Sequence, residues 1–216
     1  MSNKVKTALA RLMSILPLKE RQENCGKEIK ALHQMMLRSF VDKGCILTRD
    51  EMAQHVGNID HAIKVLVDND MVVFSKNGDP VGAYPFTMEV REHKIRVNGQ
   101  EIHAMCALDS LAVSPMFGMK TRISSVCRVS GEPVFINQSG KIIENETGAA
   151  DVCFGIAWGA ASSCTCCAKS LCMEMMFLKD SDTATCWLEQ NPDDREIFTL
   201  QEAVDFSALF FLPLMS

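Results

Sequence analysis

The sequence predicts an α+β fold, with an N-terminal helical, winged-helix-like module followed by a mainly antiparallel β core with flanking helices. Residues 5–67 carry apolar side chains mostly at helical spacing, whereas residues 71–137 hold short alternating runs joined by Asn-Gly and Ser-Gly turns. The apolar content of 47% and the charged content of 23% are typical of a globular protein. The apolar pattern changes from helical spacing to alternation near Pro85, so we expect two units, residues 1–83 and residues 84–216.

The N-terminal module is predicted to contain four helices and a β-hairpin. Its third helix begins with a capping box formed by Thr48 and Glu51, and Gly44 ends the helix before it. Asn77-Gly78 is a hairpin turn between two short strands. The predicted helices cover residues 5–16, 27–41 and 48–56, with a fourth from Asn58 or Asp60, and the strands cover 71–75 and 81–83.

Helices followed by a hairpin form a winged helix-turn-helix pattern, and this pattern suggests DNA binding. The segment that would enter the major groove, Asn58–Asp70, carries Asp60, Asp68 and Asp70 against the single Lys64. Phosphate contact needs basic side chains, and the whole chain has a net charge of −5. We therefore expect a structural role for this module and no nucleic-acid partner.

The second unit is predicted to consist of hairpin-linked strands with a few helices. Strands are expected over residues 86–91, 94–97, 100–103, 119–126, 133–137, 152–156 and 173–178, and a loop over 140–150. One helix is expected from near Cys106, and another from Ser181 or Asp182 to Glu189. The last helix covers residues 199–211 and opens with a Thr-x-x-Glu capping box.

The stretch Glu101–Ser114 holds the main candidate site, because Cys106 and Asp109 lie three residues apart where a strand gives way to a helix. Residues at i and i+3 share one helical face, so the thiol and the carboxyl are expected side by side. The helix N-terminus is expected to lower the pKa of the thiol, and apolar neighbours are expected to raise the pKa of Asp109. The alternative for both residues is a structural role, as a buried small side chain and as a partner of the helix dipole.

Ten cysteines are many for this chain, and their spacing differs from that of small disulfide-rich proteins. Arg11 interrupts any signal-peptide core, so a reducing, cytoplasmic compartment is expected. The longest uncharged run, Val152–Ala168, is too short and too rich in glycine and serine to cross a membrane. The cysteines are then expected to be free thiols, metal ligands or catalytic groups.

A second group of cysteines comprises Cys164, Cys166, Cys167 and Cys172. Cys164 and Cys167 have the Cys-x-x-Cys spacing that occurs in zinc knuckles and redox pairs. A structural zinc site would need a second such knuckle, and a redox motif would need a preceding βαβ unit. The sequence offers neither, so this spacing alone assigns no chemistry.

Four further motifs are Cys106-Ala-Leu-Asp109-Ser-Leu, Thr121-Arg-Ile-Ser-Ser-Val-Cys127, Gly131-Glu-Pro133-Val, and Ser170-Leu-Cys172 ahead of an apolar strand. Together with the hairpin from Tyr84 and the N-terminal module, they resemble the organomercurial lyases, also called alkylmercury lyases. The resemblance covers residues 30–211 and is strongest over residues 84–135.

The resemblance implies a site of two cysteines and one aspartate, which by motif are Cys106, Cys172 and Asp109. It also implies a structural role for Cys127. The chain departs from the family pattern at Met173, where some members carry another cysteine. A second departure is a set of extra thiols before Cys172, each an alternative partner for Cys106, namely Cys164, Cys166 and Cys167.

The activity that the resemblance implies is cytoplasmic protonolysis of carbon–mercury bonds, giving a hydrocarbon and Hg(II). Mercury is soft and prefers thiolates, so Cys106 would capture the organomercurial, Cys172 would add electron density, and Asp109 would deliver the proton. No organic cofactor is expected. A low-molecular-weight thiol would remove the metal, with mercuric reductase as the implied acceptor. The alternative is a thiol-based metal-binding or metal-sensing protein that cleaves no bond.

Overall fold

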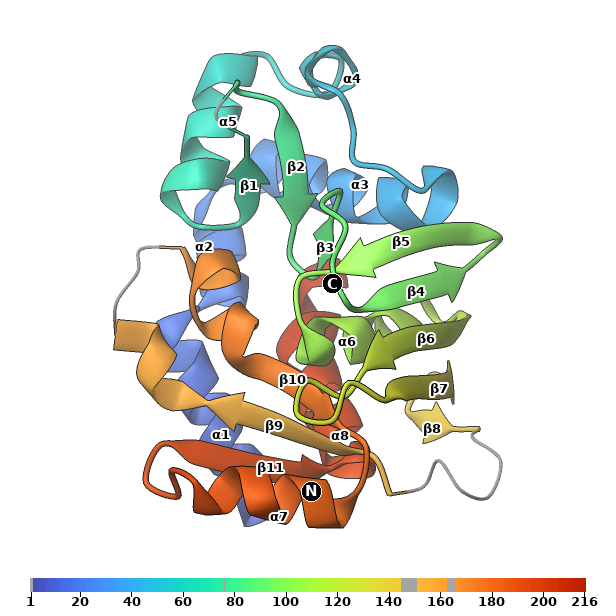
Figure 1. Ribbon diagram of the computed structural model, residues 1–216. Helices are drawn as coiled ribbons and strands as arrows, with labels where there is room; N and C mark the ends of the chain where they lie inside the picture. The colour runs from blue at the N-terminus through green and yellow to red at the C-terminus, as the bar shows by residue number, and fades with distance from the viewer. Residues whose placement is uncertain (1, 76, 145–150, 163–165) are drawn as a thin grey trace.

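The computed structural model describes residues 2–75, 77–144, 151–162 and 166–216, which form two β-sheets surrounded by helices (Figure 1). All neighbouring strands in the two sheets are antiparallel over the described residues. The predicted mixture of helices and a mainly antiparallel β core is confirmed. Within the same residues, no helix combines the length and the apolar character that a membrane span needs.

Five helices make up most of the first seventy residues: α1 (Asn3–Ile15), α2 (Leu18–Asn24), α3 (Lys27–Lys43), α4 (Arg49–Ala53) and α5 (Ile59–Asp68). Four of them were predicted, and α2 was missed because it has only seven residues and follows Pro17 directly. The Thr48–Glu51 capping box is confirmed. Gly44 ends α3 with a φ of 77°, in the left-handed region that glycine adopts without strain.

The larger sheet has eight strands: β1 (Val72–Phe74), β2 (Pro80–Ala83), β3 (Phe86–Thr87), β4 (Lys94–Val97), β5 (Gln100–Ala104), β6 (Lys120–Val126), β7 (Pro133–Ser139) and β8 (Ile142–Ile143). Their spatial order is β1-β2-β3-β5-β4-β6-β7-β8. Residues alternate between buried and exposed along β6 and β7, so one face of the sheet packs on the core and the other meets solvent. β3 is shorter than predicted, and β8 lies in the part of the predicted 140–150 loop that the structure describes.

The smaller sheet has three strands, β9 (Cys153–Ala157), β10 (Met175–Leu178) and β11 (Arg195–Thr199), in the order β10-β9-β11. The sequence did not predict β11, because Arg195 and Glu196 obscure the apolar pattern of a short strand. It also began β10 two residues early, since Met173 belongs to the short 3-10 helix η3 (Leu171–Glu174).

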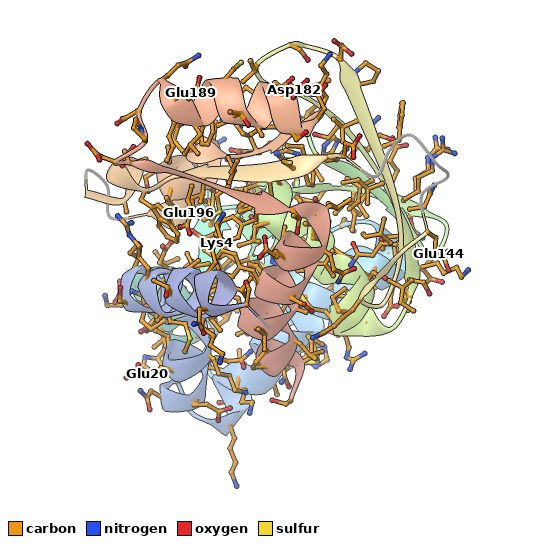
Figure 2. The ribbon with its side chains drawn as sticks, turned by 90° about the horizontal axis from the view of Figure 1, so that it is seen from below. Lys4, Glu20, Glu144, Asp182, Glu189 and Glu196 are labelled. Carbon is orange, nitrogen blue, oxygen red and sulfur yellow. The ribbon has the colours of Figure 1, made fainter. Side chains whose placement is uncertain are left out.

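Helices cover both faces of the smaller sheet. In Figure 2, α7 (Ser181–Glu189), marked by Asp182 and Glu189, lies over one face, and α1 and α8 (Leu200–Phe211) lie over the other. Lys4 of α1 donates a hydrogen bond to the Ile197 carbonyl of β11. α7 begins with Asp180 as its N-cap, one residue before the predicted start, because the carboxylate accepts the Thr183 N–H.

Helix α6 (Ala107–Phe117) lies between the two sheets and packs against α8, β5 and β10 (Figure 1). Its residues from Ala107 to Ser114 are all buried. Pro115 cannot donate to the Leu111 carbonyl one turn earlier, and the buried Gln138 side chain donates to that carbonyl instead, at 3.0 Å. A core helix is therefore fixed at the position where the candidate site begins.

Candidate active site

Cys106 is the N-cap of α6, directly after β5. Its backbone is extended, with φ −150° and ψ 179°, and its Sγ accepts the Asp109 N–H at 3.4 Å. A cysteine thus takes the place that serine, threonine or aspartate usually occupies at a helix start. The i, i+3 relation predicted from the sequence is confirmed, and it is stabilised by this capping hydrogen bond.

Asp109 lies in the first turn of α6 and is 2% exposed. Its Oδ2 has no hydrogen-bond partner among the described residues. An unpartnered carboxyl oxygen in a protein core is unfavourable for folding, which makes Asp109 a candidate functional residue. Burial raises the pKa of Asp109 to about 7, against smaller lowering effects from Cys106 and Arg91, and the predicted direction is confirmed.

Cys172 reaches the same place from a distant part of the chain. It lies in η3, which leads into β10, and it is 3% exposed. The Sγ atoms of Cys106 and Cys172 and a carboxyl oxygen of Asp109 all lie within 4.8 Å of one another. The structure therefore brings together all three residues that the sequence singled out as candidate site residues.

The two thiols are strongly biased towards their neutral forms. Burial raises the pKa of Cys106 to about 12, despite lowering contributions from Cys172 and the Asp109 N–H. Contact with Cys106, then with Cys167, and then burial raise the pKa of Cys172 well above its usual range. The sequence prediction of a lowered thiol pKa at the helix N-terminus was wrong, because desolvation in the core outweighs the helix dipole.

The segment that carries Cys172 is held by two polar side chains, the buried Tyr84 and the half-buried Asp70. The Tyr84 hydroxyl accepts the Ala168 N–H at 2.7 Å and donates to Asp70 Oδ1 at 3.2 Å. Asp70 Oδ2 accepts the Cys167 N–H at 3.0 Å. These hydrogen bonds fix the 3-10 helix η2 (Cys167–Lys169), which immediately precedes η3. Sequence patterns gave no sign of these partners, which lie more than 80 positions away.

Arg91 links the two segments that carry the sulfurs. Its guanidinium donates to the Met105 carbonyl at 3.1 Å and to the Ala168 carbonyl at 3.2 Å, and lies 3.3 Å from Met173 Sδ. Met105 and Met173 are the neighbours of Cys106 and Cys172 in the chain. All three also line a surface cavity of about 780 Å³. This cavity is the candidate entrance to the buried site, and sequence reasoning missed Arg91.

The other residues considered from the sequence lie around this site. His103 contacts the backbone of Arg91 through Nδ1 and is not part of the three-residue cluster. Cys127 is buried, and its Sγ accepts the Ser130 N–H in the turn between β6 and β7. Among the alternative thiols, Cys167 lies 3.8 Å from Cys172, Cys166 lies near Tyr84, and Cys164 falls outside the described residues.

The sequence profile of the alkylmercury lyase family, MerB, matches residues 86–211, more than half of the chain. The chain belongs to the alkylmercury lyase family. The matched range holds Cys106, Asp109 and Cys172, and the prediction of an enzyme of this family is confirmed.

Individual alkylmercury lyases resemble the chain along most of its length. The alkylmercury lyase of Bacillus cereus is 26% identical over 207 residues, which cover 95% of this chain and 92% of that protein. The Streptomyces lividans enzyme is 25% identical over 158 residues, covering 72% and 71%. The crystal structure of the mercury-bound form of MerB2 has the same fold, with a TM-score of 0.74 and 20% identity over 92% of this chain and 98% of that one.

Proposed function

We propose that this protein breaks the carbon–mercury bond of organomercurials by protonolysis, with Cys106, Cys172 and Asp109 as the reacting groups. The observation that carries the proposal is the buried convergence of two sulfurs and one carboxyl oxygen within 4.8 Å. Membership of the alkylmercury lyase family supports the reaction class. Mercury is the substrate metal here, and it is matched by the soft sulfur ligands.

The first step is capture of the organomercurial by Cys106. The substrate arrives as a thiolate complex, and Cys106 replaces that thiol: the Hg–S bond to the carrier breaks, a new Hg–S bond forms, and the Cys106 proton leaves with the carrier thiol. Met105 and Met173 line the approach through the cavity and offer soft sulfur to the metal. The capture leaves a two-coordinate mercury that still carries its organic group.

The second step moves one proton from Cys172 to carbon. Cys172 is neutral because its pKa is raised, so a base must remove its proton before the sulfur can bind mercury. Asp109, with a pKa of about 7, is a suitable acceptor and then a suitable donor near neutral pH. The second thiolate weakens the Hg–C bond, Asp109 protonates the carbon, the hydrocarbon leaves, and Hg(II) stays between the two sulfurs.

The reaction written in this way needs no organic cofactor. It does need an external thiol, because the product is Hg(II) bound to two protein sulfurs in a buried site. Low-molecular-weight thiols and then mercuric reductase are the acceptors that fit this chemistry. The cytoplasm fits it as well, because free thiols persist in a reducing compartment, and the nine cysteines of the described residues are all free.

The N-terminal helices and the β1-β2 hairpin are proposed to form a winged-helix-like module, residues 1–83, that supports the core of residues 84–216. Hydrogen bonds from Asp70 and Tyr84 to the η2 backbone favour this structural role over nucleic-acid binding. The candidate recognition helix, α5, adds support, because its Lys64 is paired with Asp68. The large sheet itself continues across the proposed boundary through β2 and β3.

The test is incubation of the protein with methylmercury and excess monothiol, with methane measured in the headspace and Hg(II) measured in solution. Wild type is expected to release both in equal amounts. Cys106→Ser is expected to release neither, because its hydroxyl does not capture mercury, although serine still caps α6. Asp109→Asn is expected to lose about 10²–10⁴-fold in turnover, the range for a positioned general acid.

Cys186→Ser is the matched control, because Cys186 is exposed on α7 and lies outside the cluster. It is expected to keep wild-type turnover. Tight methylmercury binding by wild type without methane would contradict the lyase proposal, and would favour the alternative of a metal-binding or metal-sensing protein.

A further inference from the structure

Cys167 is a buried thiol that the proposed cleavage reaction does not use. It is 6% exposed, and its Sγ lies 3.8 Å from the Sγ of Cys172, which is also the proposed partner of Cys106. Cys172 therefore belongs to two sulfur pairs. The second pair has no place in bond cleavage, which requires only two thiols and one carboxyl.

The position of Cys167 is fixed by groups that lie far away in the sequence. Asp70 accepts its N–H, and the Tyr84 hydroxyl accepts the N–H of the next residue, Ala168. The hydrogen bond to Tyr84 is buried and the one to Asp70 is part-buried, and leaving a buried group unpaired destabilises the fold. This arrangement holds the Cys167 sulfur against Cys172 even though η2 is only three residues long.

The two sulfur pairs suit different forms of the metal. An organomercurial cation already has one carbon ligand and needs one sulfur, so a second thiol pair adds nothing to its capture. Bare Hg(II) prefers two thiolates, and a pair of neighbouring cysteines supplies them. To admit the ion, the two sulfurs would have to move apart from 3.8 Å by rotation about a Cα–Cβ bond.

We infer that Cys167 and Cys172 form a second binding site for Hg(II), which takes the ion from Cys106 after cleavage. The inference rests on the proposed function for the source of the ion. In the exchange, the Hg–S bond to Cys106 breaks and a bond to Cys167 forms. The Cys167 thiol gives up its proton, and the Cys106 thiolate receives one, so charge and protons balance and Cys106 is restored.

The second site lies next to a partly exposed residue. Cys106 is 1% exposed, whereas Cys166, the residue before Cys167, is partly exposed. Cys166 lies beside Tyr84, at 3.9 Å from its hydroxyl oxygen. Transfer of Hg(II) from Cys106 to Cys167 therefore places the ion next to a partly exposed residue.

The test uses mercuric chloride, so that it does not depend on cleavage. Cys106→Ser, Cys106→Ser/Cys167→Ser and the matched control Cys106→Ser/Cys186→Ser are loaded with one equivalent, passed through a desalting column in the presence of glutathione, and assayed for mercury. Sulfur coordination is read by X-ray absorption, and folding by circular dichroism. Cys106→Ser and the control are expected to retain mercury bound by two sulfurs, and the Cys167 double variant is expected to lose it.

Retention of mercury in the Cys167 double variant at the level of Cys106→Ser would overturn the inference, as would loss from Cys106→Ser itself in a folded protein. Failure of the lyase proposal is recognised separately, as absence of methane from wild type. In a single turnover with methylmercury, Cys167→Ser is expected to form methane at the wild-type rate and to release Hg(II) to glutathione more slowly. An unchanged release rate would equally count against the second site.

Discussion

The two halves of the site position the same kind of ligand by different means. Cys106 and Asp109 lie at the start of a buried helix, and one local hydrogen bond between neighbours in sequence fixes their relation. Cys172 lies in a short 3-10 helix, and its segment is held by side chains that are distant in sequence, Asp70, Tyr84 and Arg91. One sulfur is therefore placed by secondary structure and the other by tertiary contacts.

The largest effect is expected at Cys106 and Asp109, the half of the site at the start of α6. It should appear in the pH dependence of kcat/KM for methane release. In the proposed reaction, the carboxylate form of Asp109 is the base that receives the Cys172 proton, and this form is populated above the pKa of about 7. The rate should therefore rise with pH up to about 7 and then level off. Asp109→Asn should lack this limb, whereas Asp182→Asn, at an exposed position of α7, should keep it. A flat wild-type profile would exclude Asp109 as the base.

The raised pKa of Asp109 also predicts how the free energy of unfolding depends on pH. The pKa of Asp109 is raised from 3.8 to about 7, so the folded chain holds this proton where the unfolded chain has lost it. The stabilising contribution is complete below pH 3.8 and is lost as pH rises through about 7. Urea unfolding should show Asp109→Asn gaining on the order of 4 kcal/mol relative to wild type between these limits. A constant difference across this range would contradict the raised pKa.

A smaller effect is expected at the half of the site that tertiary contacts position, the segment that carries Cys172. Tyr84→Phe removes the acceptor for the Ala168 N–H and is expected to destabilise the fold by about 1–3 kcal/mol, the usual result of leaving a buried group unpaired. It should also slow the cleavage step, because Cys172 is less well placed. Ser207→Ala is the matched control, since Ser207 makes one buried hydrogen bond to the Leu108 carbonyl of α6. Equal losses of turnover in both variants, measured at equal fractions folded, would remove the distinction between the two halves.

The smallest effect is expected where the two halves meet. The Arg91 guanidinium lowers the pKa of Asp109 by electrostatic attraction. Arg91→Met should therefore move the rising limb of the pH–rate profile to higher pH and lower the rate at neutral pH. Arg122→Met, at an exposed position of β6, should leave the limb where it is. If the rising limb of the pH–rate profile does not move in Arg91→Met, then Arg91 only holds the two segments together and does not set the pKa of Asp109.

The half of the site placed by secondary structure could be predicted from local sequence patterns, and the half placed by tertiary contacts could not. Cys106 and Asp109 were singled out as a candidate pair from their spacing, because helical periodicity relates residues three apart, and the resemblance then implied their roles. Cys172 was assigned by resemblance with three thiols left as alternatives, because no local pattern reports a contact across more than 60 residues. The 3.8 Å between the Cys167 and Cys172 sulfurs came only from the structure, because the two residues lie five positions apart in two separate short 3-10 helices.

The fold was predictable to a similar extent. Helices with caps, such as α4 and α8, were located from the cap residues themselves. α2 and β11 were missed because each is short and carries no distinct apolar period. The direction of the Cys106 pKa shift was predicted wrongly. Sequence patterns locate the start of a helix but do not show how deeply that start is buried.

The uncharged state of Cys106 has a consequence for selectivity among reactive compounds. Alkylating agents and peroxides attack thiolates, and a thiol with a pKa of about 12 presents almost none at neutral pH. A thiophilic heavy metal, by contrast, displaces the proton as it binds. If Cys106 captures mercury as proposed, its sulfur therefore stays unreactive towards common electrophiles and oxidants until an organomercurial binds.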